Sequence, residues 1–303
     1  MASKPTTPTH AFETLTAKQA SALLEKNNVN RSVRDTVVDK YARDMSSGDW
    51  DLCMAPIVID VDGNILDGQH RLLAQVKTGE KIKWLVIRNA PKDAQKNIDT
   101  GAVRSIADHL HFAGEINSGL LAAVTRNVHK IKHGQMAGGT PLSASEILRT
   151  LEEHPEIRHS TAKAMQTRGV SLTPIAPSVL GAAHWMIGQV NGEPDADIFI
   201  WRISEMTNEP DGSPVLALMR RCNEIKRMRQ HVKHRDFLAM TIKAWNLDAQ
   251  GKKLRKISTY SKTGQYVLPE VIKREVPLAE IYDAEAAEDA FDPDEEEAEA
   301  ESA

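Results

Sequence analysis

The sequence predicts an α+β domain followed by an all-α domain and an acidic tail. Short apolar segments bounded by turn residues, typical of strands, occur before Gly114, whereas apolar residues three or four apart, typical of helices, dominate from there to about residue 246. Residues 280 to 303 contain twelve acidic and no basic residues, a composition typical of disorder. The expected segments are a flexible leader (1–11), the α+β domain (12–114), a helical domain with a basic C-terminal part (115–260), and an extended segment with a disordered acidic tail (261–303).

The composition excludes several classes of protein. The chain has 303 residues, of which 41% are hydrophobic and 26% charged, as in a globular protein of about two domains. No apolar run approaches the ~20 residues that cross a bilayer, and the polar start MASKPTTPTH lacks the apolar part of a secretory signal. We therefore expect a cytoplasmic protein without a membrane role. Cys53 and Cys222 are expected to be small core residues, without a disulfide framework or a cysteine metal site.

Capping patterns predict the first two helices. Thr16 with Gln19, and Ser32 with Asp35, each form a capping-box pattern, in which two residues three apart bond to each other's backbone N–H groups. The second helix is expected to stop at Gly48.

A hairpin and a helix follow. Residues 56 to 68, PIVIDVDGNILDG, place turn chemistry at 62 to 64 between two short apolar strands. QHRLLAQVK has a helical apolar face that Gly79 ends, and WLVIRNA, residues 84 to 90, is a buried strand.

The later helices show the same signals. Ser105 with Asp108, and Ser143 with Glu146, repeat the capping-box pattern. Helical periodicity is found in LLAAVTRNVHKI, SASEILRTLEEH, PSVLGAAHWMI, DADIFIWRISEM and PVLALMRRCNEIKRMRQHV.

The segment NILDGQHRLLAQV, residues 64 to 76, turns from a strand directly into a helix. A helix N-terminus presents unpaired N–H groups and a partial positive charge, which favour phosphate. Gly68 removes a Cβ that would block an anion, Arg71 offers a planar set of donors, and His70 adds a donor that exchanges a proton near neutral pH. The pattern predicts a phosphate-binding element. The alternative is that Asp67 is only an N-cap, with His70 and Arg71 exposed in the first turn.

This element resembles that of the ParB/sulfiredoxin superfamily, in which a Gly-x-x-Arg or Gly-Cys-His-Arg sequence between a strand and a helix binds nucleotide phosphates. The DGQHR sequence at 67 to 71 is closer still to ParB-like proteins of phages and bacterial mobile elements. Asn30-Arg31, YARDMSSGDW (41 to 50) and NIDTGAVRSIADHL (97 to 110) follow one another as in that group. The resemblance covers residues 28 to 112, and more loosely the helical region with the Ala-Trp-Asn sequence at 244 to 246.

The resemblance implies a ParB/sulfiredoxin-like N-terminal domain that binds a nucleoside triphosphate, CTP or ATP with Mg²⁺. It assigns phosphate binding to Gly68, Gln69, His70 and Arg71. Two further polar blocks are expected at the nucleotide: the pair Asn30 and Arg31, and the block with Asp99, Thr100, Gly101 and Arg104. Gln69 stands where sulfiredoxins have a catalytic Cys, so reduction of sulfinic acids is not expected. A partition clamp is not the favoured interpretation, because neither a DNA-binding helix-turn-helix nor a dimerising C-terminus is identified.

Two aspartates are candidate magnesium ligands. Asp67 and Asp99 together would hold Mg²⁺ beside a triphosphate, since magnesium favours one or two carboxylates with phosphate oxygens. The alternative for the block at Asp99 is a turn with an N-cap. Asp67 and His70 are also the candidate catalytic residues if the protein is an enzyme.

Two histidine pairs carry a weaker metal signal. His109 and His111 form a His-x-His sequence, and His129 and His133 lie one helical turn apart, a spacing that binds zinc. Because no third ligand is evident, solvated or capping histidines are the favoured interpretation.

The region from Arg220 to Lys256 is basic. It contains twelve Lys or Arg residues against three acids, a concentration typical of a surface that contacts the nucleic-acid backbone. The candidate DNA-binding residues are Arg220, Arg221, Arg227, Arg229, Lys233, Arg235, Lys252, Lys253 and Arg255. Trp245 and Tyr260 are candidates for base stacking. The alternative is an ordinary solvated helix face.

Together these patterns favour a ParB-like protein that binds a nucleoside triphosphate and contacts DNA in phage or mobile-element transactions. The sequence leaves open whether the nucleotide is hydrolysed. One alternative is a DNA nuclease or nucleotide phosphotransferase, which is weakened because few acidic metal ligands cluster around Asp67. Another is a non-enzymatic adaptor that binds a host or phage protein. A homodimer also stays open.

Overall fold

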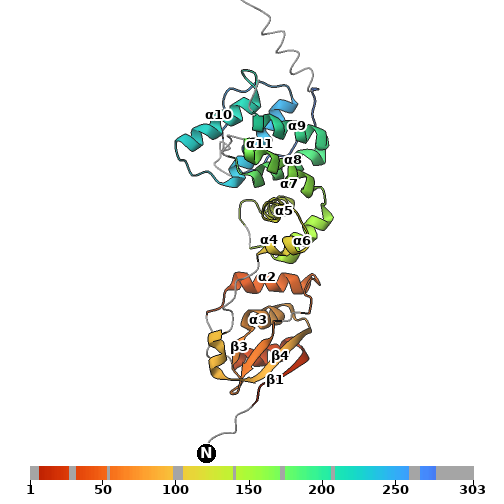
Figure 1. Ribbon diagram of the computed structural model, residues 1–303, viewed down its shortest axis with the longest axis vertical. Helices are drawn as coiled ribbons and strands as arrows, with labels where there is room; N and C mark the ends of the chain where they lie inside the picture. Colours follow the sequence, from red (N-terminus) through yellow and green to blue (C-terminus); the bar gives the residue numbers. More distant parts are fainter. Residues whose placement is uncertain are drawn as a thin grey trace, which may run out of the picture. The chain divides into compact units, whose positions relative to one another are not determined.

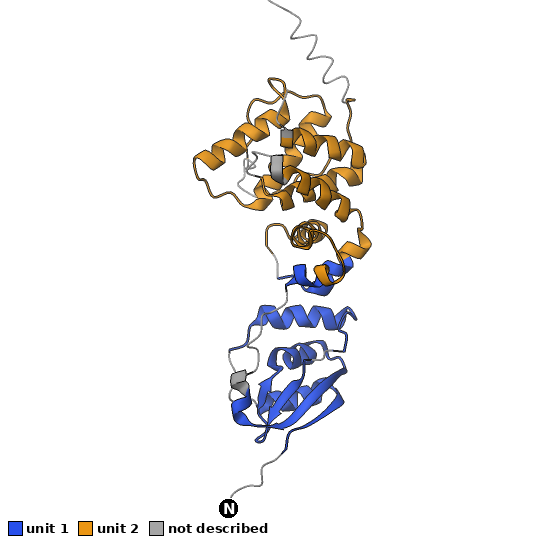
Figure 2. Ribbon diagram, viewed as in Figure 1, with its two compact units in different colours: residues 1–109, 139–149 blue, residues 110–138, 150–303 orange. Residues whose placement is uncertain are grey.

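A computed structural model of the chain divides into two compact units, which are described separately (Figure 2). Unit 1 comprises residues 1–109 and 139–149, and unit 2 comprises residues 110–138 and 150–303. The structure describes residues 7–26, 32–52, 55–97, 105–138, 141–170, 175–205, 209–258 and 267–277.

Unit 1 contains a four-stranded mixed sheet with the strand order β1-β4-β2-β3 (Figure 1). The strands are β1 (Thr9–Leu15), β2 (Ile57–Asp60), β3 (Ile65–Asp67) and β4 (Ile82–Ala90). β2 and β3 form the expected antiparallel hairpin, while β4 pairs parallel to β2 and antiparallel to β1. Since β1 begins at Thr9, the expected leader of residues 1–11 extends too far. The strand was missed because its pairing with β4 joins residues more than sixty positions apart.

Helices α1 (Ala17–Glu25), α2 (Asp35–Ser46) and α3 (Gln69–Thr78) belong to this unit, with a 3₁₀ helix at Lys92–Asn97. Thr16 and Gln19 form the predicted capping box. The sheet and the helices bury a main core, in which Trp84 donates from Nε1 to Gln75 Oε1 at 2.8 Å. The fully or largely buried residues of this core are Leu15, Ala20, Val38, Ala42, Met45, Ile57, Ile59, Ile65, Leu72, Ala74, Trp84 and Val86.

The predicted start of the second helix is wrong. α2 begins at Asp35, and its N-cap is Arg34, whose side chain makes no capping hydrogen bond, whereas Ser32 lies outside the helix. The backbone N–H of Arg34 donates to His70 Nε2 at 3.1 Å. This long-range contact holds Arg34 in an extended conformation and thereby sets where the helix starts.

A second segment, residues 139–149, returns to unit 1, so the expected boundary at residue 114 is also corrected. Ser143 and Glu146 form the predicted capping box at the start of α6 (Ala144–Glu153). Ser143 Oγ also donates to Asp44 Oδ1 at 2.6 Å, and Arg43 pairs with Glu146. These polar contacts, about a hundred residues apart in sequence, explain why the segment belongs to unit 1.

The part of unit 2 that the structure describes is helical. Its remaining helices are α4 (Ile106–Phe112, cut by the unit boundary), α5 (Ser118–Lys132), α7 (Ile157–Val170), α8 (Pro177–Asn191), α9 (Glu193–Glu205), α10 (Pro214–Arg227) and α11 (His234–Ala249). Ser105 and Asp108 form the predicted capping box of α4. α8 is buried over most of its length and packs against α5, α7, α9 and α11. Cys222 is a core residue as expected, and burial raises the pKa of its thiol to about 12. Cys53 lies outside the described residues.

The C-terminal segment 267–277 is held against the helices of unit 2 by backbone and side-chain hydrogen bonds. Asn246 Nδ2 donates to the carbonyl of Glu270, and Trp245 Nε1 donates to that of Ile272. Trp245 is fully buried, with the guanidinium of Arg274 4.7 Å from its ring. The prediction that Trp245 stacks on bases is therefore wrong, because this segment covers it. Residues 278–303, with the acidic tail, lie outside the described residues.

Among the described helices, none combines the length and the apolar character that crossing a bilayer requires.

Candidate functional site

The strand β3 passes into α3 through Gly68, which adopts a left-handed conformation with a φ of +101°. A Cβ at this position would overlap Ile57 Cδ1. Gly68 is therefore required by the close approach of the turn to β2, quite apart from any ligand. The sequence pattern indicated an unusual backbone here without revealing that reason.

Arg71 and Asp67 bond to each other and to the surrounding backbone. The Arg71 guanidinium donates to the carbonyls of Ala55 and Pro56, and its Nη2 lies 2.9 Å from Asp67 Oδ2. Asp67 Oδ1 accepts from the N–H of Gly68 at 2.6 Å. Arg71 is 8% exposed, so the alternative of an exposed first-turn arginine does not hold. These contacts give Arg71 a structural role in fixing the start of α3.

His70 is also buried, and its Nε2 accepts the hydrogen bond from the backbone of Arg34. That contact requires a lone pair on Nε2. The ring is therefore the neutral tautomer whose proton is on Nδ1. In this arrangement His70 orients the segment before α2.

A cavity of about 290 Å³ opens at the start of α3. Its lining comes from α2 and the residues around it, the segment before β2, and the first turn of α3: Arg34, Val37, Tyr41, Trp50, Ala55, Asp67, Gly68, Gln69, His70 and Arg71. Two buried polar atoms of this lining, Trp50 Nε1 and Gln69 Oε1, have no hydrogen-bond partner among the described residues. Such atoms are costly unless a ligand or water satisfies them. The cavity thus offers a donor, an acceptor, helix N-terminal amides and the Arg34 cation.

Five of the predicted nucleotide-binding residues lie outside the described part of the chain: Asn30, Arg31, Thr100, Gly101 and Arg104. The predicted magnesium ligand Asp99 lies outside it as well. The structure brings Gly68, Gln69, His70 and Arg71 together at one cavity. Arg34, Tyr41 and Trp50 are lining residues that the sequence did not single out as ligand contacts. YARDMSSGDW contains two of them, but nothing in its spacing places them at this site.

Both oxygens of Asp67 accept from donors of the protein, and its expected magnesium partner Asp99 is not among the described residues. Magnesium binding at this site stays a prediction.

The basic region of unit 2 is largely exposed. Among the nine candidate DNA-binding residues, Arg220, Arg227, Arg229, Lys233, Lys252, Lys253 and Arg255 are exposed. Arg221 is half-buried and pairs with Glu224 at 2.6 Å, and Arg235 donates to the carbonyl of Ala137. Tyr260 lies outside the described residues.

Charges from two segments of this region converge on one acidic side chain. The pKa of Glu224 is lowered first by its hydrogen bond with Arg221 and further by the charges of Lys256 and Arg227. Lys256 follows α11, whereas the other residues lie on α10. The backbone N–H of Leu254 donates to the carbonyl of Gly212, so the segment after α11 lies beside the start of α10. The fold therefore gathers basic residues that are distant in sequence.

One of the two predicted histidine pairs, His129 with His133, makes local contacts. His129 and His133 stack with ring centroids 4.1 Å apart, His129 Nδ1 bonds to Thr150 Oγ1, and His133 Nδ1 bonds to the carbonyl of His129. His109 and His111 lie on α4, and neither belongs to a group of three or more metal-ligating side chains among the described residues.

A different polar cluster, which the sequence did not predict, lies where α7, α8 and α9 meet. It contains His159, His184 and Asp197, whose ligand atoms all lie within 4.8 Å of one another. Burial lowers the pKa of His184, with Asp197 opposing. Burial alone would raise the pKa of Asp197, but hydrogen bonds from Lys163, His184 and His159 lower it to about 2. The three residues come from three helices, and so no short sequence pattern could reveal them.

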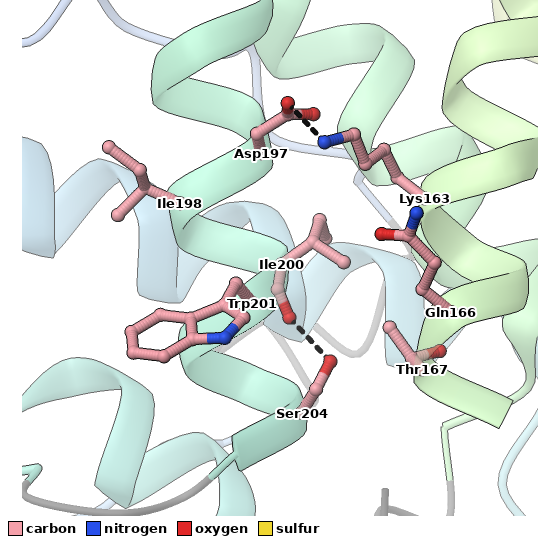
Figure 3. A pocket seen from close by; sticks show the side chains of 8 residues that line it. All are labelled: Lys163, Gln166, Thr167, Asp197, Ile198, Ile200, Trp201 and Ser204. Atoms are coloured by element: carbon pink, nitrogen blue, oxygen red, sulfur yellow. Dashed lines mark hydrogen bonds and ion pairs between the residues drawn. The ribbon is translucent and has the colours of Figure 1, made fainter. Parts of the chain in front are cut away.

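A cavity of about 300 Å³ adjoins this cluster. Among its lining residues, Lys163 and Asp197 face each other directly (Figure 3), and Lys163 Nζ lies 2.6 Å from Asp197 Oδ2. Gln166 and Thr167 of α7 and Trp201 of α9 also line the cavity. Trp201 is 57% exposed. The lining of this cavity therefore combines apolar side chains, Ile198, Ile200 and Trp201, with the Lys163–Asp197 ion pair.

Comparisons with protein-family models, with curated proteins and with solved structures found no match for this chain. The functional argument therefore depends on the chemistry of these sites.

Proposed function

We propose that unit 1 binds a nucleoside triphosphate at the start of α3, and that the protein acts in DNA transactions of a phage or mobile element through the basic region of unit 2. The observation that carries the nucleotide proposal is the cavity beside a helix N-terminus, with two buried polar atoms that have no partner in the part of the chain that the structure describes. The resemblance of DGQHR to ParB-like phosphate-binding elements supports the same ligand class.

The lining suits a phosphorylated ligand with an aromatic base. Backbone amides at the start of α3 favour an anion, and Arg34 adds an exposed guanidinium at the same cavity. Tyr41 and Trp50 supply aromatic surface, which commonly contacts a nucleobase. The volume is near the lower end of the range of roughly 300 to 1,000 Å³ for small-molecule pockets, so part of a triphosphate would extend beyond it.

Arg71 is not the best residue for testing this proposal, because its substitution would remove the hydrogen bonds to Ala55 and Pro56 and disturb the fold. Arg34 and Gln69 are more informative. Arg34 is exposed, and Gln69 has a side-chain oxygen that lacks a partner among the described residues.

Isothermal titration of the full chain with CTP, ATP and GTP, each with and without Mg²⁺, tests the proposal. We expect one of them to bind, and Arg34→Gln to weaken that binding about tenfold, since a charge-assisted hydrogen bond contributes roughly 1.5 kcal/mol or more. Gln69→Leu should also weaken it.

Lys81→Gln is the matched control, because it removes an exposed cation in the turn after the opposite end of α3. Absence of binding by all three nucleotides, or equal binding by the Arg34→Gln and Lys81→Gln variants, contradicts the proposal. Release of inorganic phosphate in the same samples decides whether the nucleotide is hydrolysed.

DNA contact is a second proposal, and the exposure of seven candidate cations favours it. Lys and Arg that face solvent are available for phosphates, whereas those in tight ion pairs are not. Arg227, Arg229 and Lys233 lie close together in sequence at the end of α10 and in the loop before α11. We expect them to contribute more than the paired Arg221.

Fluorescence anisotropy with duplex DNA at several salt concentrations tests this proposal. Replacing Arg227, Arg229 and Lys233 by Gln should weaken binding. It should also make the negative slope of log K against log salt shallower by about 2 to 3, since each phosphate contact contributes about 0.9 to its magnitude. The control variant replaces Lys18, Lys81 and Lys83 by Gln, an equal loss of charge in unit 1. The same slope for both variants and the wild type would count against a DNA-contacting role for this region.

A further inference from the structure

Two imidazoles and a carboxylate from three helices of unit 2 come together, with their ligand atoms all within 4.8 Å of one another. Asp197 Oδ1 lies 2.8 Å from His184 Nε2 and 3.1 Å from His159 Nε2. His159 belongs to α7, His184 to α8 and Asp197 to α9. Since the three helices pack directly against one another, the packing of the helices fixes the relative positions of these three side chains.

Outer partners orient two of the three groups. Ser160 Oγ lies 2.9 Å from His184 Nδ1, which leaves Nε2 of the same ring facing Asp197. Lys163 Nζ lies 2.6 Å from Asp197 Oδ2, the carboxylate oxygen that does not face the histidines. Metal-binding histidines and carboxylates typically have such partners on their second polar atom.

The same contacts form a Ser–His–Asp hydrogen-bond chain, but acyl transfer is a poor explanation of it. Ser160 is 2% exposed and His184 is 1% exposed, so a substrate carbonyl cannot reach the Ser160 hydroxyl. By contrast, the side chain of His159 is 37% exposed, which gives a small ion a path to the cluster.

We propose that His159 Nε2, His184 Nε2 and Asp197 Oδ1 form a Zn²⁺ site. Tetrahedral zinc with ligand bonds of about 2.0 to 2.1 Å places ligand atoms about 3.3 Å apart. The two contacts to Asp197, at 2.8 and 3.1 Å, need to open by about half an ångström or less, and the two histidine nitrogens already lie within 4.8 Å of each other. Imidazole nitrogen favours zinc over magnesium or calcium.

The fourth position is taken by water or by Glu193. Glu193 lies one helical turn before Asp197, and its Oε2 is 4.0 Å from His159 Nε2. Asp197 also lines the cavity of about 300 Å³, so a ligand in that cavity would lie near the ion.

Lys163 provides a test that separates metal binding from a purely structural role. Its ammonium group opposes a second cation at Asp197 while it stabilises the metal-free carboxylate. If zinc binds here, Lys163→Met should tighten zinc binding even though it weakens the metal-free cluster.

The experiment is isothermal titration of the full chain with ZnCl₂, together with the visible spectrum of the Co²⁺-substituted protein. We expect one ion per chain, bound at least tenfold more weakly by His159→Ala and by the isosteric Asp197→Asn, and bound more tightly by Lys163→Met. His159→Ala should remain folded because the side chain is partly exposed, and circular dichroism verifies this.

His133→Ala is the matched control, because it removes one histidine of the stacked pair at the C-terminal end of α5 and leaves the cluster intact. No zinc binding by the wild type, unchanged affinity in both His159→Ala and Asp197→Asn, or an equal loss in His133→Ala overturns the proposal.

Discussion

At the scale of single residues, several side chains that the sequence marks for ligands also support the fold. Gly68 is required by contact with Ile57, and Arg71 joins the start of α3 to the segment before β2. His70 fixes the backbone of Arg34. A substitution at any of these three positions is therefore expected to change the structure as well as any binding.

Asp60 shows how one carboxylate organises the hairpin between β2 and β3. Its Oδ1 accepts from the backbone N–H groups of Asp62 and Asn64, and its Oδ2 accepts from Asn64 Nδ2. Burial alone would raise the pKa of Asp60, but these hydrogen bonds and the nearby Lys92 charge lower it below its usual value.

We predict that this carboxylate makes the stability of unit 1 depend on pH. Because the folded-state pKa is lowered, the stabilisation is present above the unfolded-state value of about 3.9 and is lost as the pH falls toward the folded-state pKa. Asp60→Asn should therefore destabilise the protein by roughly 1 kcal/mol near neutral pH and by less below pH 4. Urea unfolding from pH 3 to 7 measures the difference.

Asp51→Asn, at an exposed aspartate, serves as the control for that measurement. A difference between the wild type and Asp60→Asn that stays constant over the whole pH range would show that the charge of Asp60 is unimportant.

At the scale of elements, hydrogen bonds between residues three apart were predictable. Three capping boxes, beginning at Thr16, Ser105 and Ser143, are confirmed because each closes within one helical turn. The fourth pattern, beginning at Ser32, fails because a long-range contact to His70 decides the start of α2. β1 was missed for a similar reason, since its partner β4 is distant in sequence.

Helices α9 and α11 are joined by a buried ion network that the sequence did not indicate. Arg202 pairs with Glu209 at 2.7 Å and with Asp248 at 2.8 Å, and all three side chains are at most 4% exposed. Asp248 also accepts from Arg274 of the C-terminal segment. The network therefore connects two helices and the segment 267–277.

Removing Arg202 is predicted to destabilise unit 2 strongly. Arg202→Met leaves the Glu209 carboxylate buried without its partner, and the loss of one member of a buried pair costs about 3 to 5 kcal/mol. The double variant Arg202→Met with Glu209→Gln should recover part of this loss. Chemical denaturation measures both.

Arg220→Met is the matched comparison, because Arg220 and its partner Asp211 are well exposed and such pairs contribute at most about 1 kcal/mol. Similar losses for Arg202→Met and Arg220→Met would show that the buried network is not important for stability.

At the scale of the whole molecule, the two units differ in secondary structure and in the candidate sites that they contain. Strands occur in unit 1, whereas the described part of unit 2 is helical and carries both the basic region and the His–Asp cluster. The division is not a single cut in the sequence, because residues 139–149 return to unit 1 through contacts such as that of Ser143 with Asp44. No composition shift marks this return.

The sequence by itself determined the helix caps, the hairpin, the change from mixed to helical structure, and the basic region, because these depend on near neighbours or on composition. Only the tertiary structure decided that Arg71 bonds to backbone carbonyls, that Trp245 is covered by residues 267–277, and that His159, His184 and Asp197 meet. The physical reason is that such contacts join residues on different elements. Their positions follow from how the helices and strands pack, and no local spacing records that packing.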